Sequence, residues 1–427
     1  MPLKLRLTIL QFLQFFIWGS WLLTIGAYWF QTKGWAGSDF GAIFSTMGIS
    51  ALFMPAIAGI ISDRWINAEK LYAFFHFCGA ITLFFLPSAT SPDTMFWIML
   101  VNMIFYMPTL ALSITVSYSA MKQQKMNIVS EFPPIRVWGT IGFIVALWVV
   151  SLASLEKEAG QFYLASACSV VLSLFALTMP KCPPLGKVSE AGEKSQSLFS
   201  ALGLDAFKLF KNPKMALFLF FSMLLGAALQ LTNAYGDTFL HDFSAMEIYK
   251  DSFAVRYPAV IMSISQISET LFILTIPFVL KRFGIKKVMF ISMVAWALRF
   301  GLFSIGNPTD RLWMIILSCI IYGMAFDFFN ISGSLFMESQ VDEKMRGSAQ
   351  GLFMMMVNGF GAFLGSRISG ILIDKYFFIE GRFDWPGIWM SFAIYSAVIA
   401  ILFLLLFRDS KKVQVETCPA KGQHAEA

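Results

Sequence analysis

Long apolar stretches separated by short polar segments follow one another from Leu7 almost to the end of this 427-residue chain. Each stretch holds about 20 residues, which as a helix spans roughly 30 Å of hydrocarbon. The pattern predicts an all-α integral membrane protein with twelve transmembrane helices. The predicted helices cover residues 7–31, 40–61, 71–88, 94–117, 134–152, 161–180, 215–240, 258–280, 285–306, 312–337, 347–373 and 385–407.

Only 14% of the residues are charged and 57% are hydrophobic, so the charged surface of an ordinary soluble protein is missing. The formal net charge of +6 would suit an acidic partner such as nucleic acid. Most Lys and Arg residues, however, fall in the loops and tails on the side of the N-terminus, as the positive-inside rule expects of cytoplasmic segments. We therefore predict a multi-pass protein of the bacterial inner membrane, with both termini in the cytoplasm and no nucleic-acid partner.

A polar and basic segment divides the predicted helices into two sets of six. This segment covers residues 181–214 and is predicted to be a cytoplasmic linker. It separates an N-terminal six-helix half, residues 1–180, from a C-terminal six-helix half, residues 215–407. Residues 408–427 are predicted to form a cytoplasmic tail.

The two halves repeat each other at corresponding places. Glycine and clustered charges close both the second helix, around residues 59–70, and the eighth helix, around residues 281–287. The fifth and eleventh helices both open with an arginine, Arg136 or Arg346, that precedes two glycines. A parallel repeat of six helices, with a site between the halves, resembles the major facilitator superfamily.

Two acidic residues stand out deep within predicted helices, where a charge costs about 3 kcal/mol at the helix centre, and both are therefore candidates for a functional site. Glu269 lies near the middle of the eighth helix, with Gln266 one turn earlier on nearly the same face. Asp327 lies inside the tenth helix beside Tyr322 and Phe326, whose spacing puts both rings on one face. A flat heterocycle could stack on these rings. The alternatives are a buried polar pair without a transport role and aromatic rings that serve packing alone.

Polar side chains on two further helices offer hydrogen bonds to the same interior. Gln230 and Asn233 are one turn apart on the seventh helix, and amides both donate and accept, as ribose hydroxyls and base edges require. Such amides also serve simply to hold helices together. On the fifth helix Arg136, Thr140 and Phe143 share one side, although an arginine near a helix end can also extend to the surface.

The remaining polar residues do not indicate an enzyme or a metal site. Arg299 and Arg367 lie in the outer halves of their helices, and we expect them to form ion pairs or to reach the surface. His76, His241 and His424 lie far apart, and the five cysteines have no paired spacing, so we expect no cofactor, no bound metal and no catalytic residue. The sequence contains no GxxxxGK[ST] phosphate loop, and transport would draw on a gradient.

Several uninterrupted segments resemble the bacterial nucleoside:proton symporter family, the group of nucleoside and xanthosine permeases. The similarity runs nearly end to end, and its strongest segments are FLQFFIWGSWL from Phe12, FPPIRVWGTIGFI from Phe132, GLDAFKLFKNP from Gly203, SISQISETLFILTIPF from Ser263, KRFGIKKVM from Lys281 and YGMAFDFFNISGS from Tyr322. The resemblance implies that the nucleoside is held between the halves. The residues that match the binding positions of the family are Arg136, Thr140, Phe143, Gln230, Asn233, Gln266, Glu269, Tyr322, Phe326 and Asp327.

The resemblance predicts proton-coupled uptake of nucleosides by alternating access. A neutral nucleoside gains nothing from the membrane potential, whereas a proton gains about 2.3 kcal/mol per 100 mV. Glu269 and Asp327 are both candidates to carry the proton, because burial disfavours the charged form of a carboxyl group. A proton symporter for a sugar or another small polar solute, a membrane enzyme and a passive channel remain as alternatives, and the preferred base stays open. We expect a monomer.

Overall fold

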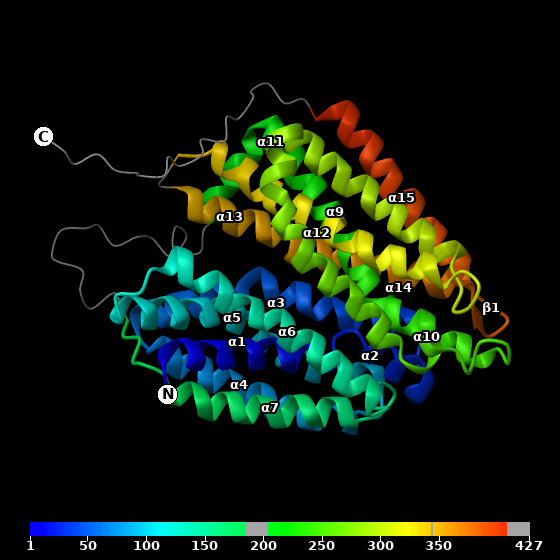
Figure 1. Ribbon diagram of the computed structural model, residues 1–427, viewed down its shortest axis with the longest axis horizontal. Helices are drawn as coiled ribbons and strands as arrows, with labels where there is room; N and C mark the ends of the chain where they lie inside the picture. The colour runs from blue at the N-terminus through cyan, green and yellow to red at the C-terminus, as the bar shows by residue number, and fades with distance from the viewer. Residues whose placement is uncertain (185–203, 343–344, 408–427) are drawn as a thin grey trace, which may run out of the picture.

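The computed structural model describes residues 1–184, 204–342 and 345–407, and it arranges their helices in two bundles that lie side by side (Figure 1). The elements of the first bundle are α1 (Leu3–Gly19), α2 (Ile25–Ala27), η1 (Tyr28–Lys33), α3 (Gly37–Arg64), α4 (Ala68–Phe85), η2 (Leu86–Ser88), α5 (Pro92–Gln123), α6 (Ile128–Leu152) and α7 (Gly160–Leu177). Within this bundle α1 packs on α6, α3 on α5 and α4 on α7.

The second bundle begins after the linker region. Its elements are η4 (Leu204–Lys211), α9 (Pro213–Asp242), η5 (Phe243–Ala245), α10 (Phe253–Arg256), α11 (Pro258–Ile305), α12 (Leu312–Ser339), α13 (Arg346–Met354), η7 (Met355–Gly361), α14 (Ala362–Leu372), η8 (Ile373–Phe377), β1 (Phe378–Ile379), β2 (Arg382–Phe383) and α15 (Trp385–Leu406). Here α11 packs on both α12 and α15, and α9 packs on α14. Much of the predicted linker 181–214 and the whole predicted tail 408–427 lie outside the described residues.

Helices long enough to cross a membrane account for most of the described chain. Ten helices among these residues have the required length and apolar composition. One of them, α11, has 48 residues and contains both the eighth and the ninth predicted spans. The two spans meet at Gly284, where φ of 76° and ψ of 164° interrupt the helix and turn the chain. The first predicted span is present as α1 followed by α2 and η1. The predicted all-α membrane fold is confirmed, and the helices are consistent with twelve spans.

The start of α6 differs from the prediction. The helix begins at Ile128, well before the predicted start at residue 134, and contains Pro133 and Pro134. Asn127 holds this extra turn, because its Oδ1 accepts a hydrogen bond from the Ser130 N–H at 3.3 Å. In return, the Glu131 carboxylate accepts a hydrogen bond from the Asn127 N–H at 3.3 Å. Reciprocal capping of this kind fixes a helix start that the apolar pattern alone does not indicate.

The two ends of the molecule carry different segments of the chain. The N-terminus, residues 181–184 and the end of α15 lie at one end, which we call the termini face (Figure 1). The hairpin of β1 and β2 and the connection from α9 to α11 lie at the opposite end, which we call the hairpin face (Figure 1). The hairpin turns through Glu380 and Gly381, whose φ values of 50° and 79° suit a two-residue turn between antiparallel strands.

Near the hairpin face the two bundles touch through backbone contacts between α3 and α14. A Cβ atom on Gly41 would lie 2.2 Å from the Ser366 carbonyl oxygen, and one on Gly370 would lie 2.4 Å from the Gly37 carbonyl oxygen. Asp374 of the second bundle accepts a hydrogen bond of 2.7 Å from the Gly37 N–H, and so places a negative charge at the N-terminus of α3. These contacts hold the hairpin face closed.

Replacing Gly41 with alanine should disturb this contact, because the added methyl group would overlap with the Ser366 carbonyl oxygen. We expect overpacking to lower the free energy of unfolding by about 2 kcal/mol. In the purified, detergent-solubilised protein this should lower the midpoint of thermal unfolding by several degrees. Gly59→Ala on the same helix is the matched control, since a methyl group there meets no atom within 4 Å. Its midpoint should stay constant or rise, and equal midpoints for the two variants would contradict the proposed role of the glycine contact.

Candidate functional site

Arg136 is held on α6 by a ring of the neighbouring helix α1. Its guanidinium carbon lies 4.1 Å from the centre of the Phe15 ring, a cation–π contact. The two helices can approach closely because Gly142 faces α1, where a Cβ atom would lie 2.2 Å from the Phe12 carbonyl oxygen. The Arg136 side chain is partly buried, and it interacts electrostatically with Glu269 of the second bundle.

Glu269 and Asp327 lie on adjoining helices because α11 and α12 are in backbone contact at Gly323. A Cβ atom on Gly323 would lie 2.7 Å from the Glu269 nitrogen. The Ser268 hydroxyl fixes the same contact by donating a hydrogen bond to the Ile320 carbonyl. Asp327 follows Gly323 by one helical turn, and its carboxylate is near enough to Glu269 for the two acids to interact electrostatically.

Three ionisable side chains therefore come together where the bundles meet. Arg136 belongs to the first bundle, and Glu269 and Asp327 belong to the second. Because α6 and α11 are in contact, the interaction between Arg136 and Glu269 links the two bundles. One cation and two carboxylates would carry a net charge of −1, so that a single proton would make the group neutral.

Aromatic rings lie on both sides of this group. Tyr322 and Phe326 are stacked with ring centres 5.8 Å apart and an angle of 3° between the planes. Gln266 forms a side-chain hydrogen bond with Tyr322. In the first bundle Phe143 stands edge-on to Trp18, with ring centres 6.5 Å apart. The second bundle thus has two parallel aromatic rings, Tyr322 and Phe326, and the first bundle has an edge-to-face pair, Trp18 and Phe143.

Several polar groups of the site lack a partner within the described chain. Buried atoms without a hydrogen-bond partner there include Asp327 Oδ2, Gln230 Oε1 and Trp18 Nε1. The partly buried Thr140 and Asn233 also form no side-chain hydrogen bond with described residues. An unpaired buried polar group costs about 1–3 kcal/mol, and such groups are suited to binding a polar solute that supplies the missing partners.

A small cavity lies next to the aromatic stack of the second bundle. Its volume is about 220 Å³ with the space open to solvent included, and its lining includes Phe326, Trp296, Leu229 and Asn330. The cavity therefore reaches the ring of Phe326 and the helix position beside Gln230. The two central acids are not among its lining residues, so the space that the structure provides for a ligand lies to one side of the charged group.

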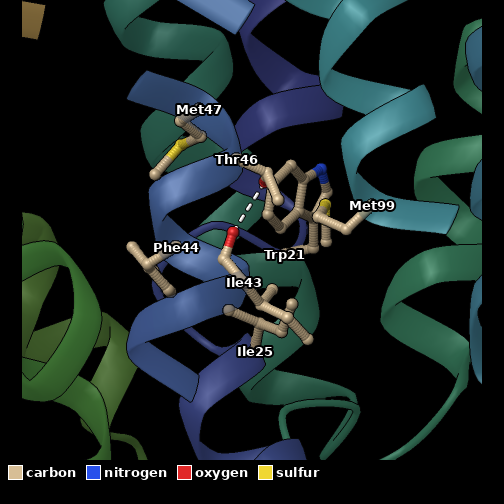
Figure 2. Close-up of a pocket in the computed structure, with 7 residues that line it drawn as sticks. All are labelled: Trp21, Ile25, Ile43, Phe44, Thr46, Met47 and Met99. Atoms are coloured by element: carbon tan, nitrogen blue, oxygen red, sulfur yellow. Dashed lines mark hydrogen bonds between the residues drawn. The ribbon is translucent and has the colours of Figure 1, made fainter. Parts of the chain in front are cut away.

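A second cavity, of about 170 Å³, lies inside the first bundle between the start of the chain, α3 and α5 (Figure 2). Its lining is nearly all apolar, with side chains such as Ile25, Phe44 and Met99. Figure 2 shows that the hydroxyl of Thr46 is already engaged, since it donates a hydrogen bond of 2.6 Å to the Ile43 carbonyl oxygen. None of the ten predicted site residues lines this cavity, and its surface does not suit a polar ligand.

Arg299 is a residue of the site region that sequence reasoning missed. We expected an ion pair or a surface position, but the side chain is fully buried in the second bundle. Its guanidinium donates hydrogen bonds of 2.6 Å to the Ser318 carbonyl oxygen and 3.3 Å to the Ser265 hydroxyl. The guanidinium carbon also lies 4.7 Å from the centre of the Tyr322 ring, and this contact fixes the ring. No sequence signal distinguished Arg299 from Arg367, which is exposed.

Two bundles of membrane-spanning helices, with an arginine, two acids and unpaired amides buried where they meet, define a secondary transporter of the major facilitator type. The sequence matches the Nucleoside H+ symporter family over residues 1–412, and the chain belongs to this family. The predicted resemblance is confirmed. The members of the family are transporters, so the chain is a proton-coupled nucleoside transporter and not an enzyme.

Individual relatives are similar over almost their whole length. The chain is 52% identical to the xanthosine permease of Escherichia coli, over 97% of this chain and 99% of the permease. It is also 52% identical to the E. coli nucleoside permease NupG, over 98% of both chains. The crystal structure of a mutant form of the nucleoside transporter NupG matches with a TM-score of 0.92, at 52% identity, over 95% of this chain and 100% of that chain.

Arg299→Lys should destabilise the protein, because an ammonium group cannot make the same set of hydrogen bonds and also stack on Tyr322. We expect a loss of about 2 kcal/mol in the free energy of unfolding, together with weaker nucleoside binding through the displaced Tyr322 ring. Thermal unfolding and a binding titration on the purified protein measure both. The exposed Arg367→Lys is the control and should behave like the wild type. Equal effects of the two substitutions would show that Arg299 does not position Tyr322.

Proposed function

We propose that the chain imports nucleosides together with protons, and that the nucleoside binds where the two bundles meet. The observation that supports this proposal most strongly is the environment of Asp327. Its side chain is only 4% exposed and one carboxylate oxygen has no partner within the described residues, yet it lies beside a second acid, Glu269. A buried, unpaired carboxylate is stable only if a proton or a ligand satisfies it, and a symporter requires both.

The ten predicted residues divide into roles that suit a nucleoside. Stacking on Tyr322 and Phe326, with Phe143 facing from the first bundle, would hold the flat base. The amides of Gln230, Asn233 and Gln266 and the hydroxyl of Thr140 would bind the ribose and the edges of the base. Arg136 would hold one acid ionised while Asp327 or Glu269 carries the proton.

The proposed movement is a rocking of two halves around this site. We propose residues 1–180 and 215–407 as these halves, residues 181–214 as the cytoplasmic linker and residues 408–427 as a cytoplasmic tail. The termini face would then be cytoplasmic and the hairpin face periplasmic, in the inner membrane of a bacterium, with the lipid as solvent and the protein as a monomer. In this orientation the contacts between α3 and α14 close the outer side.

Uptake of labelled uridine, adenosine and xanthosine by cells that lack their own nucleoside permeases tests the substrate class. We expect saturable uptake that a proton uncoupler abolishes, since a neutral solute can accumulate only through coupling to the gradient. The order of the three rates would give the preferred base. If the protein reaches the membrane and uptake stays at background for all three, the substrate is wrong and a sugar or another small polar solute becomes the better assignment.

Neutral substitutions at the two acids test the proton path. Asp327→Asn or Glu269→Gln should abolish uphill accumulation, so that the ratio of internal to external nucleoside falls by about fiftyfold at 100 mV. Exchange of labelled for unlabelled nucleoside across the membrane of a proteoliposome should continue, because it needs no net proton movement. Glu338→Gln, which changes an exposed carboxylate farther along α12, is the matched control and should retain both activities. Full accumulation in both single variants and in the double variant would exclude both acids as proton carriers.

A further inference from the structure

A second group of titratable side chains, none of them among the ten proposed site residues, lies at the hairpin face. Glu156, in the connection between α6 and α7 of the first bundle, meets Asp237 and His241 on α9 of the second bundle. The His241 Nε2 atom lies 2.7 Å from a Glu156 oxygen and 3.6 Å from an Asp237 oxygen. We call these three residues the outer triad. Because it joins the two bundles, the triad must separate whenever the hairpin face opens.

Burial makes the outer triad unusual for a surface connection. Glu156, Asp237 and His241 are 3%, 1% and 4% exposed. The free Glu156 oxygen accepts a hydrogen bond of 3.2 Å from the Ala259 N–H at the start of α11. Neither oxygen of Asp237 has a hydrogen-bond partner among the described residues. Such a carboxylate needs a positive charge close by, since an unpaired buried charge is strongly unfavourable.

The charged neighbours show which positive charge is available. Lys157, on the same connection as Glu156, interacts electrostatically with Glu156, Asp237 and Asp242, and it is partly buried. Burial lowers the pKa of Lys157 below its usual range, although the surrounding carboxylates act in the opposite direction. α11 contributes the backbone N–H of Ala259 at this place. The nitrogen nearest to both carboxylates that can carry a positive charge is therefore Nε2 of His241.

The same three residues could in principle bind a metal ion, since their ligand atoms lie within 4.8 Å of one another. Two observations favour the proton. Ligands bound to zinc at 2.0–2.2 Å are separated by about 3.3 Å in a tetrahedral site, whereas the nitrogen of His241 and the oxygen of Glu156 are at hydrogen-bond distance, 2.7 Å. Lys157 would also repel a second cation.

We propose that the outer triad is a second proton-binding site, and that it works as a latch on the outer side of the transporter. A proton on His241 attracts the carboxylates of both bundles and holds the hairpin face closed. Loss of this proton removes the attraction, so acidification of the outer side favours the closed form and a rise in pH favours opening. Because this direction assumes the proposed symport and orientation, the latch rests on the proposed function, but its opening can be measured without transport.

The test measures the distance between the bundles at the hairpin face in the full-length protein. Spin labels on cysteines at Thr90 and Asp310, in the connections before α5 and before α12, report this distance after the five native cysteines are replaced with alanine. Double electron–electron resonance between pH 5.5 and 8, without nucleoside, gives the fractions of open and closed molecules. We expect the open fraction of the otherwise unmodified protein to fall as the pH falls.

Glu156→Gln removes the charge that attracts a proton on His241 and should raise the ratio of open to closed molecules about tenfold at pH 5.5, as expected for the loss of one close charge pair. The ratio should then no longer depend on pH. Glu158→Gln removes an exposed carboxylate from the same connection and should respond to pH like the unmodified protein. A merely structural role for Glu156 would lower the closed fraction and leave the pH dependence in place.

Two further measurements could overturn the proposal independently of transport. If Asp327→Asn abolishes the pH response while Glu156→Gln keeps it, the central acids control the outer side and the triad is not a latch. If micromolar zinc closes the unmodified protein and leaves the Glu156→Gln variant unchanged, the triad is a metal site. Failure of nucleoside uptake with an intact pH response at the triad would refute the proposed substrate and leave the latch standing.

Discussion

Hydrocarbon provides no hydrogen-bond partners, and this constraint decides where the polar side chains of the protein lie. In the first bundle Gln14 satisfies its neighbours, since its oxygen accepts a hydrogen bond of 2.6 Å from Tyr72 and its amide donates one of 2.9 Å to Thr109. In the second bundle Arg299 does the same with backbone and hydroxyl oxygens. Gln14 and Arg299 thus each satisfy polar groups within their own bundle. The groups left unpaired where the bundles meet, above all Asp327, are consequently available to a solute and a proton.

The contacts between the bundles are of a kind that can open again. Near the hairpin face α3 and α14 meet through glycine backbones, and the Asp374 carboxylate caps the N-terminus of α3 from the opposite bundle. Both the helix end and the carboxylate can be solvated by water once they separate, so the closed form is favoured by only a modest free energy. The interaction of Arg136 with Glu269 lies deeper, where little water reaches it. Rocking around a central site, with an outer contact that breaks, is what alternating access requires.

Helix length and the burial of acids are properties that a sequence displays directly. The twelve apolar stretches therefore predicted the fold, and the isolated carboxylates of Glu269 and Asp327 could be selected from the chain alone. Contacts between distant segments could not be predicted from the sequence. The outer triad joins Glu156 to a histidine that looked structural in the sequence, and Arg299 resembled an arginine that reaches the surface until its partners were known. The turn at Gly284 and the early start of α6 depend on single residues that an apolar pattern does not register.

Charge balance links the central site to the direction of transport. With Arg136 protonated and both Glu269 and Asp327 ionised, the site would carry one negative charge, which is unfavourable in a closed interior. One proton on either acid makes the group neutral, so that the loaded site can be enclosed and carried through the change of shape. The nucleoside adds hydrogen bonds and no charge. The membrane potential then acts on the proton alone, and its 2.3 kcal/mol per 100 mV becomes available to concentrate a neutral solute.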